Sequence, residues 1–341
     1  MSSVGSRTAG RVVPFLLAAV VAGAAGCSSS SDGAPVTPTP NGGDGGGGGD
    51  SGGAPDTTAA AQSDFWNAMW AGDLSAGATA STELKAVVAK TPADFYSTLL
   101  VGMQSLWQIA ESERNPQTAG MVAQTNAPVA AQYLQTAHQL NPSDVFTMSL
   151  LGQFLFESGA QSNNSQQVTQ GEALMNQAYQ ADNKLGMFVP VLVGMNLPNT
   201  DPFVQSAEAG AWNYYSTCGG KTIDGTNPDF SAFLAKANSG QSGLGFCGPV
   251  AVAPHWLEGA LLWFGDSLVK VGNVNAASAA YRASASVSTS SEWPHHDLLE
   301  AALSRDLNAR AALYQGPPSM WPTPSAAPYG CGGCHNKTAP M

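Results

Sequence analysis

The spacing of apolar residues constrains the fold of this chain most, because these residues recur at helical intervals and strand-like alternation is almost absent. One broad stripe lies within residues 95–109 and consists of Phe95, Leu99, Leu100, Met103, Leu106, Trp107 and Ile109. Another helix is expected after Pro294, with apolar positions at Leu298, Leu299, Ala302, Leu307, Ala311 and Leu313. Such a stripe buries one side of a helix against its neighbours. The sequence therefore predicts an all-α fold.

Residues 254–288 carry an ordered series of bulky and small positions. The series consists of Leu261, Phe264, Gly265, Leu268, Gly272, Ala277, Tyr281 and Ser284. Gly265 and Ala277 would let two antiparallel helices approach closely, and Gly272 would end the first helix in a left-handed conformation. This spacing resembles the tetratricopeptide repeat, in which each unit is a pair of antiparallel helices.

Residues 130–184 carry two further matches to the same pattern. One copy reads Met148, Leu151, Gly152, Leu155, Gly159, Gly171, Met175 and Ala178, with about seven extra residues in a predicted polar loop at 162–170. A partial copy, which fits the second helix of a repeat, reads Ala130, Leu134, Ala137 and Pro142. The resemblance implies helix pairs stacked as a solenoid with a concave face for a peptide or partner protein. A generic helical bundle with small residues at its crossings is the alternative.

The N-terminus has the features of an export signal. Arg7 and Arg11 supply positive charge, and the apolar segment 12–25 is too short to span a membrane. The segment ends in Ala24–Cys27, which resembles the bacterial lipobox. That resemblance implies a signal peptide at 1–26 and a lipid anchor on Cys27; ordinary cleavage, with this cysteine a bystander, is the alternative.

Residues 27–61 combine the predicted anchor with a tether rich in Gly, Ser and Pro, which cannot bury a core. Ser28 after the cysteine implies, by the same resemblance, the outer membrane, on its periplasmic or outer side. The expected helical domain spans 62–315, and a Pro-rich tail spans 316–341. The net charge of −11 argues against a nucleic-acid partner.

Two of the five cysteines lie in Gly-rich sequence between helical blocks. Cys218 and Cys247 are predicted to form a disulfide, because an exported protein is in an oxidising compartment. The bond would close a loop of about 30 residues and stabilise the fold by about 3 kcal/mol. Two free thiols are the alternative.

The tail contains the pattern Cys-x-x-Cys-His at Cys331, Cys334 and His335. Two thiols at this spacing can reach the two vinyl groups of a haem, and the adjacent imidazole can reach the iron. The pattern resembles the attachment site of c-type cytochromes, which implies thioether bonds to both cysteines and His335 as the proximal ligand. The resemblance covers five residues only, and six residues follow His335, so we expect the helical body to supply the haem pocket.

The sequence does not identify the second axial ligand of the iron. His295 and His296, which precede the last expected helix, are the first candidates, and His255 is the next. A site without a second ligand would bind small gases or peroxide. Three other readings of the tail remain: a Cys331–Cys334 disulfide, a zinc site, or a motif without function.

The sequence has no zinc-protease helix or phosphate-binding loop. Its matches to the nucleophile-elbow pattern, at 49–53, and to the dinucleotide-binding pattern, within 43–52 and at 243–248, lie in Gly-rich segments with no predicted strand before them. Its carboxylates at Asp224, Asp229, Asp266 and Glu258 are scattered, and the sequence justifies no catalytic partner for any of them. We therefore expect a protein that carries or senses electrons through one haem c. It would be anchored to the membrane by its lipid and would exchange electrons with a redox partner. The alternative is a non-catalytic scaffold that binds an envelope protein on its helical-repeat face.

Overall fold

The computed structural model confirms the all-α prediction for the residues that it describes, which are 57–112, 116–182, 191, 193–195, 197–239, 247, 253–322 and 324. Within them lie twelve α-helices and two short 3₁₀ helices. The first six helices are α1 (Thr57–Ala71), α2 (Leu74–Lys90), α3 (Phe95–Ser112), α4 (Pro116–Leu140), α5 (Val145–Ser162) and α6 (Ser165–Ala181). The others are α8 (Pro202–Gly219), α9 (Ser231–Ala237), α10 (Trp256–Lys270), α11 (Val274–Ala285), η2 (Ser290–Glu292), α12 (His296–Ser304), α13 (Leu307–Tyr314) and η3 (Pro318–Met320).

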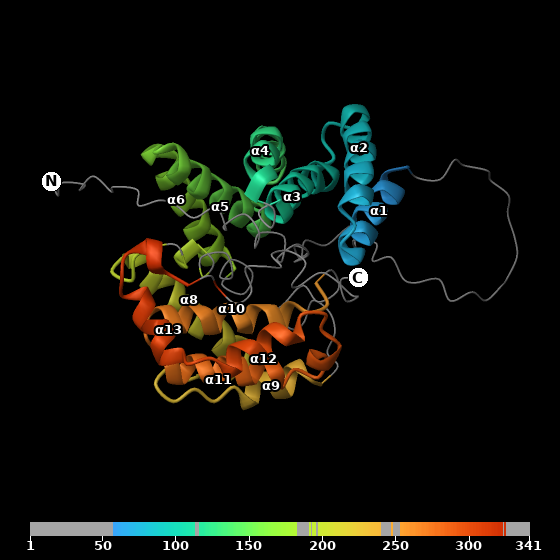
Figure 1. Ribbon diagram of the computed structural model, residues 1–341. Helices are drawn as coiled ribbons and strands as arrows, with labels where there is room; N and C mark the ends of the chain where they lie inside the picture. Colours follow the sequence, from blue (N-terminus) through green and yellow to red (C-terminus); the bar gives the residue numbers. More distant parts are fainter. Residues whose placement is uncertain are drawn as a thin grey trace, which may run out of the picture.

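Consecutive helices pack as antiparallel pairs, as the sequence predicted. The most extensive contacts join α1 to α2, α3 to α4, α5 to α6, and α10 to α11. In Figure 1 the helices α1–α6 form the upper part of the molecule and α8–α13 the lower part. Each part has its own apolar cluster, one extending from Ala61 to Leu155 and one from Val191 to Tyr314.

Glycines set the close approach within the pairs. A Cβ added at Gly152 would lie 2.9 Å from the carbonyl oxygen of Gly171, and one added at Gly265 would enter the ring of Tyr281. Gly272 adopts φ +85°, which confirms the predicted left-handed end of α10. The amide of the next residue, Asn273, then donates to the carbonyl of Leu268 at 2.8 Å. Side chains at the paired glycines would force the helices apart.

The partial repeat at residues 130–142 has a first helix that the sequence analysis treated separately. Helix α3 pairs with α4, and a Cβ at Gly102 would lie 2.9 Å from Leu134 Cδ2. Ala130, Leu134 and Ala137 are fully buried in this contact. The stripe at 95–109 and the partial repeat are therefore the two halves of one helix pair.

Two local predictions were wrong. The expected polar loop at 162–170 is mostly helix. Asn163, with φ 56°, caps the C-terminal end of α5, and the Asn164 side chain caps α6 by accepting from the amide of Gln167.

The helix expected after Pro294 is divided into α12 and α13. Asp306 ends the first segment by capping the second, since its carboxylate accepts from two amides at 3.0 Å.

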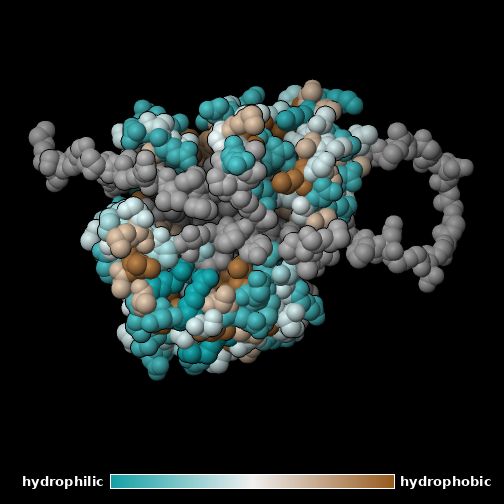
Figure 2. All heavy atoms as spheres, viewed as in Figure 1, coloured by the Kyte–Doolittle hydropathy of each residue, from teal (hydrophilic) through white to brown (hydrophobic). Residues whose placement is uncertain are grey.

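The surface is mainly hydrophilic on the face that Figure 2 shows, with hydrophobic side chains in small patches. Large apolar side chains that are exposed include Met121, Leu313 and Met320. Among the described helices, none has the length and apolar character that crossing a bilayer requires.

Gly171→Ala tests the close approach of α5 and α6. The new Cβ would lie 2.5 Å from the backbone nitrogen of Phe156, so we expect a loss of about 1–3 kcal/mol in the free energy of unfolding. Gly120→Ala is the matched control. A Cβ at this position would have no atom within 4 Å, and the substitution replaces a glycine inside helix α4. The free energy of unfolding of Gly120→Ala, measured by urea denaturation, should rise by about 1 kcal/mol, because alanine favours the helix over glycine. Equal stability of the two variants would contradict the close approach of α5 and α6.

Candidate functional site

Four of the predicted site residues lie outside the described residues. They are the expected lipid anchor Cys27 and the three residues of the haem-attachment pattern, Cys331, Cys334 and His335. Their proposed chemistry stays a prediction. The described residues do place the three candidate axial histidines, the Cys218–Cys247 pair and the beginning of the tail, and these define the candidate site.

His255 lies at the N-terminal cap of α10, where a buried carboxylate holds its ring. Its Nδ1 lies 3.2 Å from Oε1 of Glu258, one helical turn further along. The same oxygen accepts a hydrogen bond from Thr289 Oγ1 at 2.5 Å. Glu258 is fully buried and His255 is 5% exposed. Because the carboxylate of Glu258 can only accept, Nδ1 carries the hydrogen in this contact.

The contact between Glu258 and His255 was not predicted from the sequence, although a signal for it was present. His255 and Glu258 are three residues apart, a spacing that places two side chains on the same side of a helix. The other carboxylates also have partners: Asp224 accepts from Thr226, Asp229 pairs with Lys221, and Asp266 accepts from Tyr281. Each of these carboxylates therefore has a hydrogen-bond partner that the sequence did not suggest, and none of these partners is a second catalytic group.

His295 and His296 lie in different surroundings at the start of α12. The His295 side chain is enclosed, with 1% of it exposed, and its ring lies edge-on to Trp293 at 6.3 Å. His296 is closer to the surface. Its Nδ1 lies 3.2 Å from Ser290 Oγ and its Nε2 lies 3.6 Å from Glu300 Oε1.

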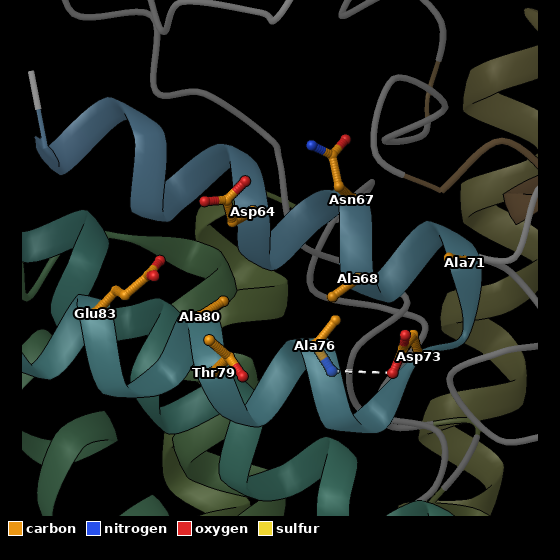
Figure 3. A pocket seen from close by; sticks show the side chains of 9 residues that line it. All are labelled: Asp64, Asn67, Ala68, Ala71, Asp73, Ala76, Thr79, Ala80 and Glu83. Carbon is orange, nitrogen blue, oxygen red and sulfur yellow. Dashed lines mark hydrogen bonds between the residues drawn. The ribbon is translucent and has the colours of Figure 1, made fainter. Parts of the chain in front are cut away.

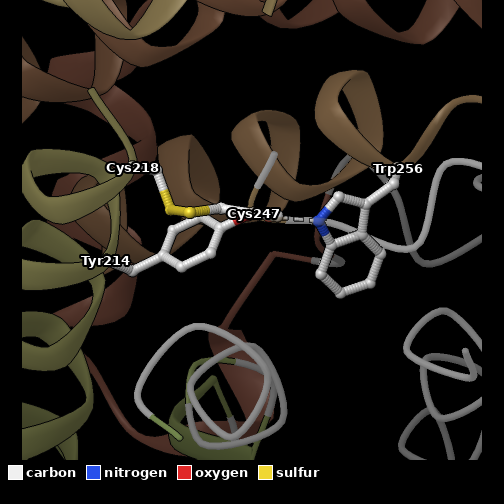
Figure 4. The surroundings of a disulfide bond; sticks show 4 residues. All are labelled: Tyr214, Cys218, Cys247 and Trp256. Atoms are coloured by element: carbon white, nitrogen blue, oxygen red, sulfur yellow. Dashed lines mark hydrogen bonds between the residues drawn. A yellow bond between two sulfur atoms is a disulfide. The ribbon is translucent and has the colours of Figure 1, made fainter. Parts of the chain in front are cut away.

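The disulfide between Cys218 and Cys247 is present, with 5.6 Å between the Cα atoms. Figure 4 shows Tyr214 beside it, and the Tyr214 hydroxyl donates to the carbonyl of Cys247. Trp256 Nε1 in turn donates to that hydroxyl at 3.2 Å. Burial raises the pKa of Tyr214, so the hydroxyl stays protonated. The disulfide thus holds the first turn of α10, next to His255.

The beginning of the tail is held at the other end of α10. The Lys270 ammonium lies 5.0 Å from the centroid of the Trp321 ring, a cation–π distance. It also donates to the carbonyl of Leu197 at 2.5 Å and to Asn199 Oδ1 at 2.8 Å. The Tyr314 hydroxyl donates to the carbonyl of Pro322 at 3.1 Å. We call this set of contacts the Lys270–Trp321 clasp; the sequence carries no local signal for it.

A shallow groove of about 430 Å³ lies between α1 and α2. Its lining includes Asp64, Asp73 and Glu83, and Figure 3 shows the Asp73 carboxylate accepting from the amide of Ala76. That bond caps α2, so it explains Asp73 structurally. The groove contains none of the predicted ligands. In the described part of the chain, no three His, Cys, Asp or Glu side chains are grouped to hold a metal ion.

Comparisons with known proteins do not add a family to this description. No protein-family model, curated protein or solved structure matches the chain.

Replacing both Cys218 and Cys247 by serine should lower the free energy of unfolding by about 3 kcal/mol, because the unfolded chain regains the freedom of the closed loop. Urea denaturation would measure the loss. A reducing agent should bring the wild type to the level of the variant and leave the variant unchanged. Equal stability of the oxidised wild type and the variant would contradict a structural role.

Burial lowers the pKa of Lys270 to about 8, with Asp201 opposing the shift. At pH values between about 8 and the ordinary pKa of lysine, 10.5, Lys270 binds more protons in the unfolded state than in the folded state. Stability due to Lys270 should therefore rise with pH, by at most about 1.4 kcal/mol per pH unit. Urea denaturation of the wild type and Lys270→Met from pH 7 to 10 would isolate this effect; a constant difference between them would contradict the shift.

Proposed function

We propose that this protein is an exported lipoprotein that binds one haem c covalently and transfers or senses electrons at the outer membrane. Cys331 and Cys334 would form the thioether bonds, and His335 would be the proximal iron ligand. The observation that carries the proposal is the Cys-x-x-Cys-His pattern itself, because this residue order matches the haem vinyl groups and the iron. The bound haem would supply one-electron redox chemistry at its iron.

The compartment supports this chemistry. The Cys218–Cys247 disulfide is consistent with an oxidising, extracytoplasmic location. Haem attachment to such motifs also belongs to compartments outside the cytoplasm, as the resemblance to c-type cytochromes implies. In this proposal Cys27 carries the lipid, and residues 28–56 form the tether between the membrane and helix α1, which begins five residues before the boundary expected from sequence.

The body offers residues that fit a haem iron. His255 is oriented by a buried carboxylate, which is the arrangement common for histidines that bind metals. The Lys270–Trp321 clasp attaches the tail to the same helix, α10, so that the tail begins at a defined place on the body. The chain would bind, orient and enclose the haem, and its redox partner would be another envelope protein.

The helix pairs support a second role for the body. Their glycine-mediated packing resembles tetratricopeptide repeats, whose concave faces bind peptides or proteins. In a protein without haem this role would remain alone, as a non-catalytic scaffold with Cys331 and Cys334 paired to each other.

Expression in a host that matures c-type cytochromes tests the proposal. The purified, denatured protein should retain haem stain and give a pyridine haemochrome band, because thioether bonds survive denaturation. Cys331→Ala and Cys334→Ala together should abolish both signals, while the Cys218→Ser/Cys247→Ser variant keeps them as the matched control. A matured wild-type sample without Soret absorbance would rule out the haem and leave the scaffold role.

A further inference from the structure

We propose that the Lys270–Trp321 clasp is a latch that holds the beginning of the tail against the end of α10 and that opens locally according to the charge on Lys270. The latch does not depend on haem binding. Three features of the clasp support it: the segments that it joins, the burial of an ammonium without an ion pair, and the separate attachment of the tail to α13.

Three separate segments meet at the Lys270 ammonium. Lys270 is the last residue of α10, and its Nζ donates to the carbonyl of Leu197 at 2.5 Å and to Asn199 Oδ1 at 2.8 Å. Asn199 Nδ2 donates in return to the carbonyl of Lys270 at 2.7 Å. The ring of Trp321 lies over the same ammonium, 5.0 Å from Nζ to the ring centroid. One side chain therefore joins α10, the segment before α8 and the tail.

The ammonium is buried without an ion pair. Lys270 is 1% exposed, and no carboxylate in the described part of the chain lies within ion-pair distance of it. Two neutral oxygens and the face of a ring replace its hydration only in part. Burial lowers the pKa of Lys270 to about 8, although Asp201 favours the charged form. The closed clasp therefore favours the neutral amine, whereas an open clasp returns the ammonium to water.

The other charged and titratable groups around the clasp keep their charge state in the same pH range. Asp266, one turn earlier on α10, is hydrogen-bonded and lies 4.0 Å from Arg310 Nη2. Burial raises the pKa of Tyr314, so its hydroxyl stays protonated. Residues 311–322 contain no charged side chain. Lys270 is therefore the group through which pH acts on the clasp.

The beginning of the tail can leave α10 and keep its own structure. Trp321 Nε1 donates to the carbonyl of Gly316 at 2.9 Å, and the Tyr314 hydroxyl donates to the carbonyl of Pro322 at 3.1 Å. Both bonds lie within the last helices and the tail, so separating Trp321 from Lys270 breaks neither. A local opening of this kind costs less free energy than global unfolding.

The coupling between charge and opening has a definite direction. Below about pH 8 Lys270 is charged in both the closed and the open clasp, so the open fraction does not depend on pH. Between about pH 8 and the ordinary pKa of lysine, 10.5, only the closed clasp loses its proton. The open fraction should therefore fall about tenfold per pH unit in this range. The latch is loosest near neutral pH and tightens in alkali.

Brief acetylation of the full-length protein with an amine-reactive ester from pH 7 to 10 tests the coupling. Mass spectrometry gives the rate at each lysine, and Lys270 can react only when the clasp is open. Lys90, which is exposed, is the internal reference. The ratio of the rate at Lys270 to the rate at Lys90 should stay constant up to about pH 8 and then fall about tenfold per pH unit. A ratio that does not change with pH would overturn the coupling.

Two further measurements test the local opening. Trp321→Ala should raise the rate at Lys270 roughly 30-fold, through the loss of a desolvated cation–π contact. Met320→Ala removes an exposed neighbouring side chain and is the matched control, which should leave the rate unchanged. Low concentrations of urea should hardly affect the rate, because a local opening exposes little surface. A rate that rises with urea as steeply as global unfolding, or an unchanged rate in Trp321→Ala, would overturn the latch.

Discussion

The C-terminal half of the molecule is organised around one helix that is enclosed along its whole length. All fifteen residues of α10 are buried, including Glu258, Asp266 and Lys270. Charged groups removed from water need hydrogen bonds or opposite charges. The surroundings of α10 supply them: Thr289 and His255 at Glu258, Tyr281 at Asp266, and Asn199 with Leu197 at Lys270. Segments far apart in the sequence are therefore brought together by the polar groups of a single helix.

This arrangement explains why the candidate site and the tail belong to one unit. The disulfide and Tyr214 brace the first turn of α10, where Glu258 orients His255. The Lys270–Trp321 clasp fixes the tail at the last turn. The two sets of contacts therefore lie at opposite ends of the same helix, α10.

The helix pairs were the most predictable part of the fold. Gly152 and Gly265 lie where the repeat-like spacing placed them, against Gly171 and Tyr281, because close helix crossings require small residues at regular positions. Helix ends were less predictable. Helix α6 begins directly after Asn163 and Asn164, in a segment that was predicted to be a loop. Asp306 caps α13 within a segment that was predicted to be one continuous helix. In both places a capping side chain sets the helix end, and the apolar periodicity does not show it. For the site, the sequence named His255 among three candidates but left Glu258 without a role.

The sequence alone determined the helical class, the pairing of helices through small residues, the Cys218–Cys247 bond and the pattern at Cys331, Cys334 and His335 that suggests a haem. These depend on residue type and short spacing, which the chain carries locally. Only the tertiary structure decided which histidine is oriented by a carboxylate, and that Lys270 holds Trp321. Those contacts join residues from separate segments, and their strength comes from burial, which no local pattern records.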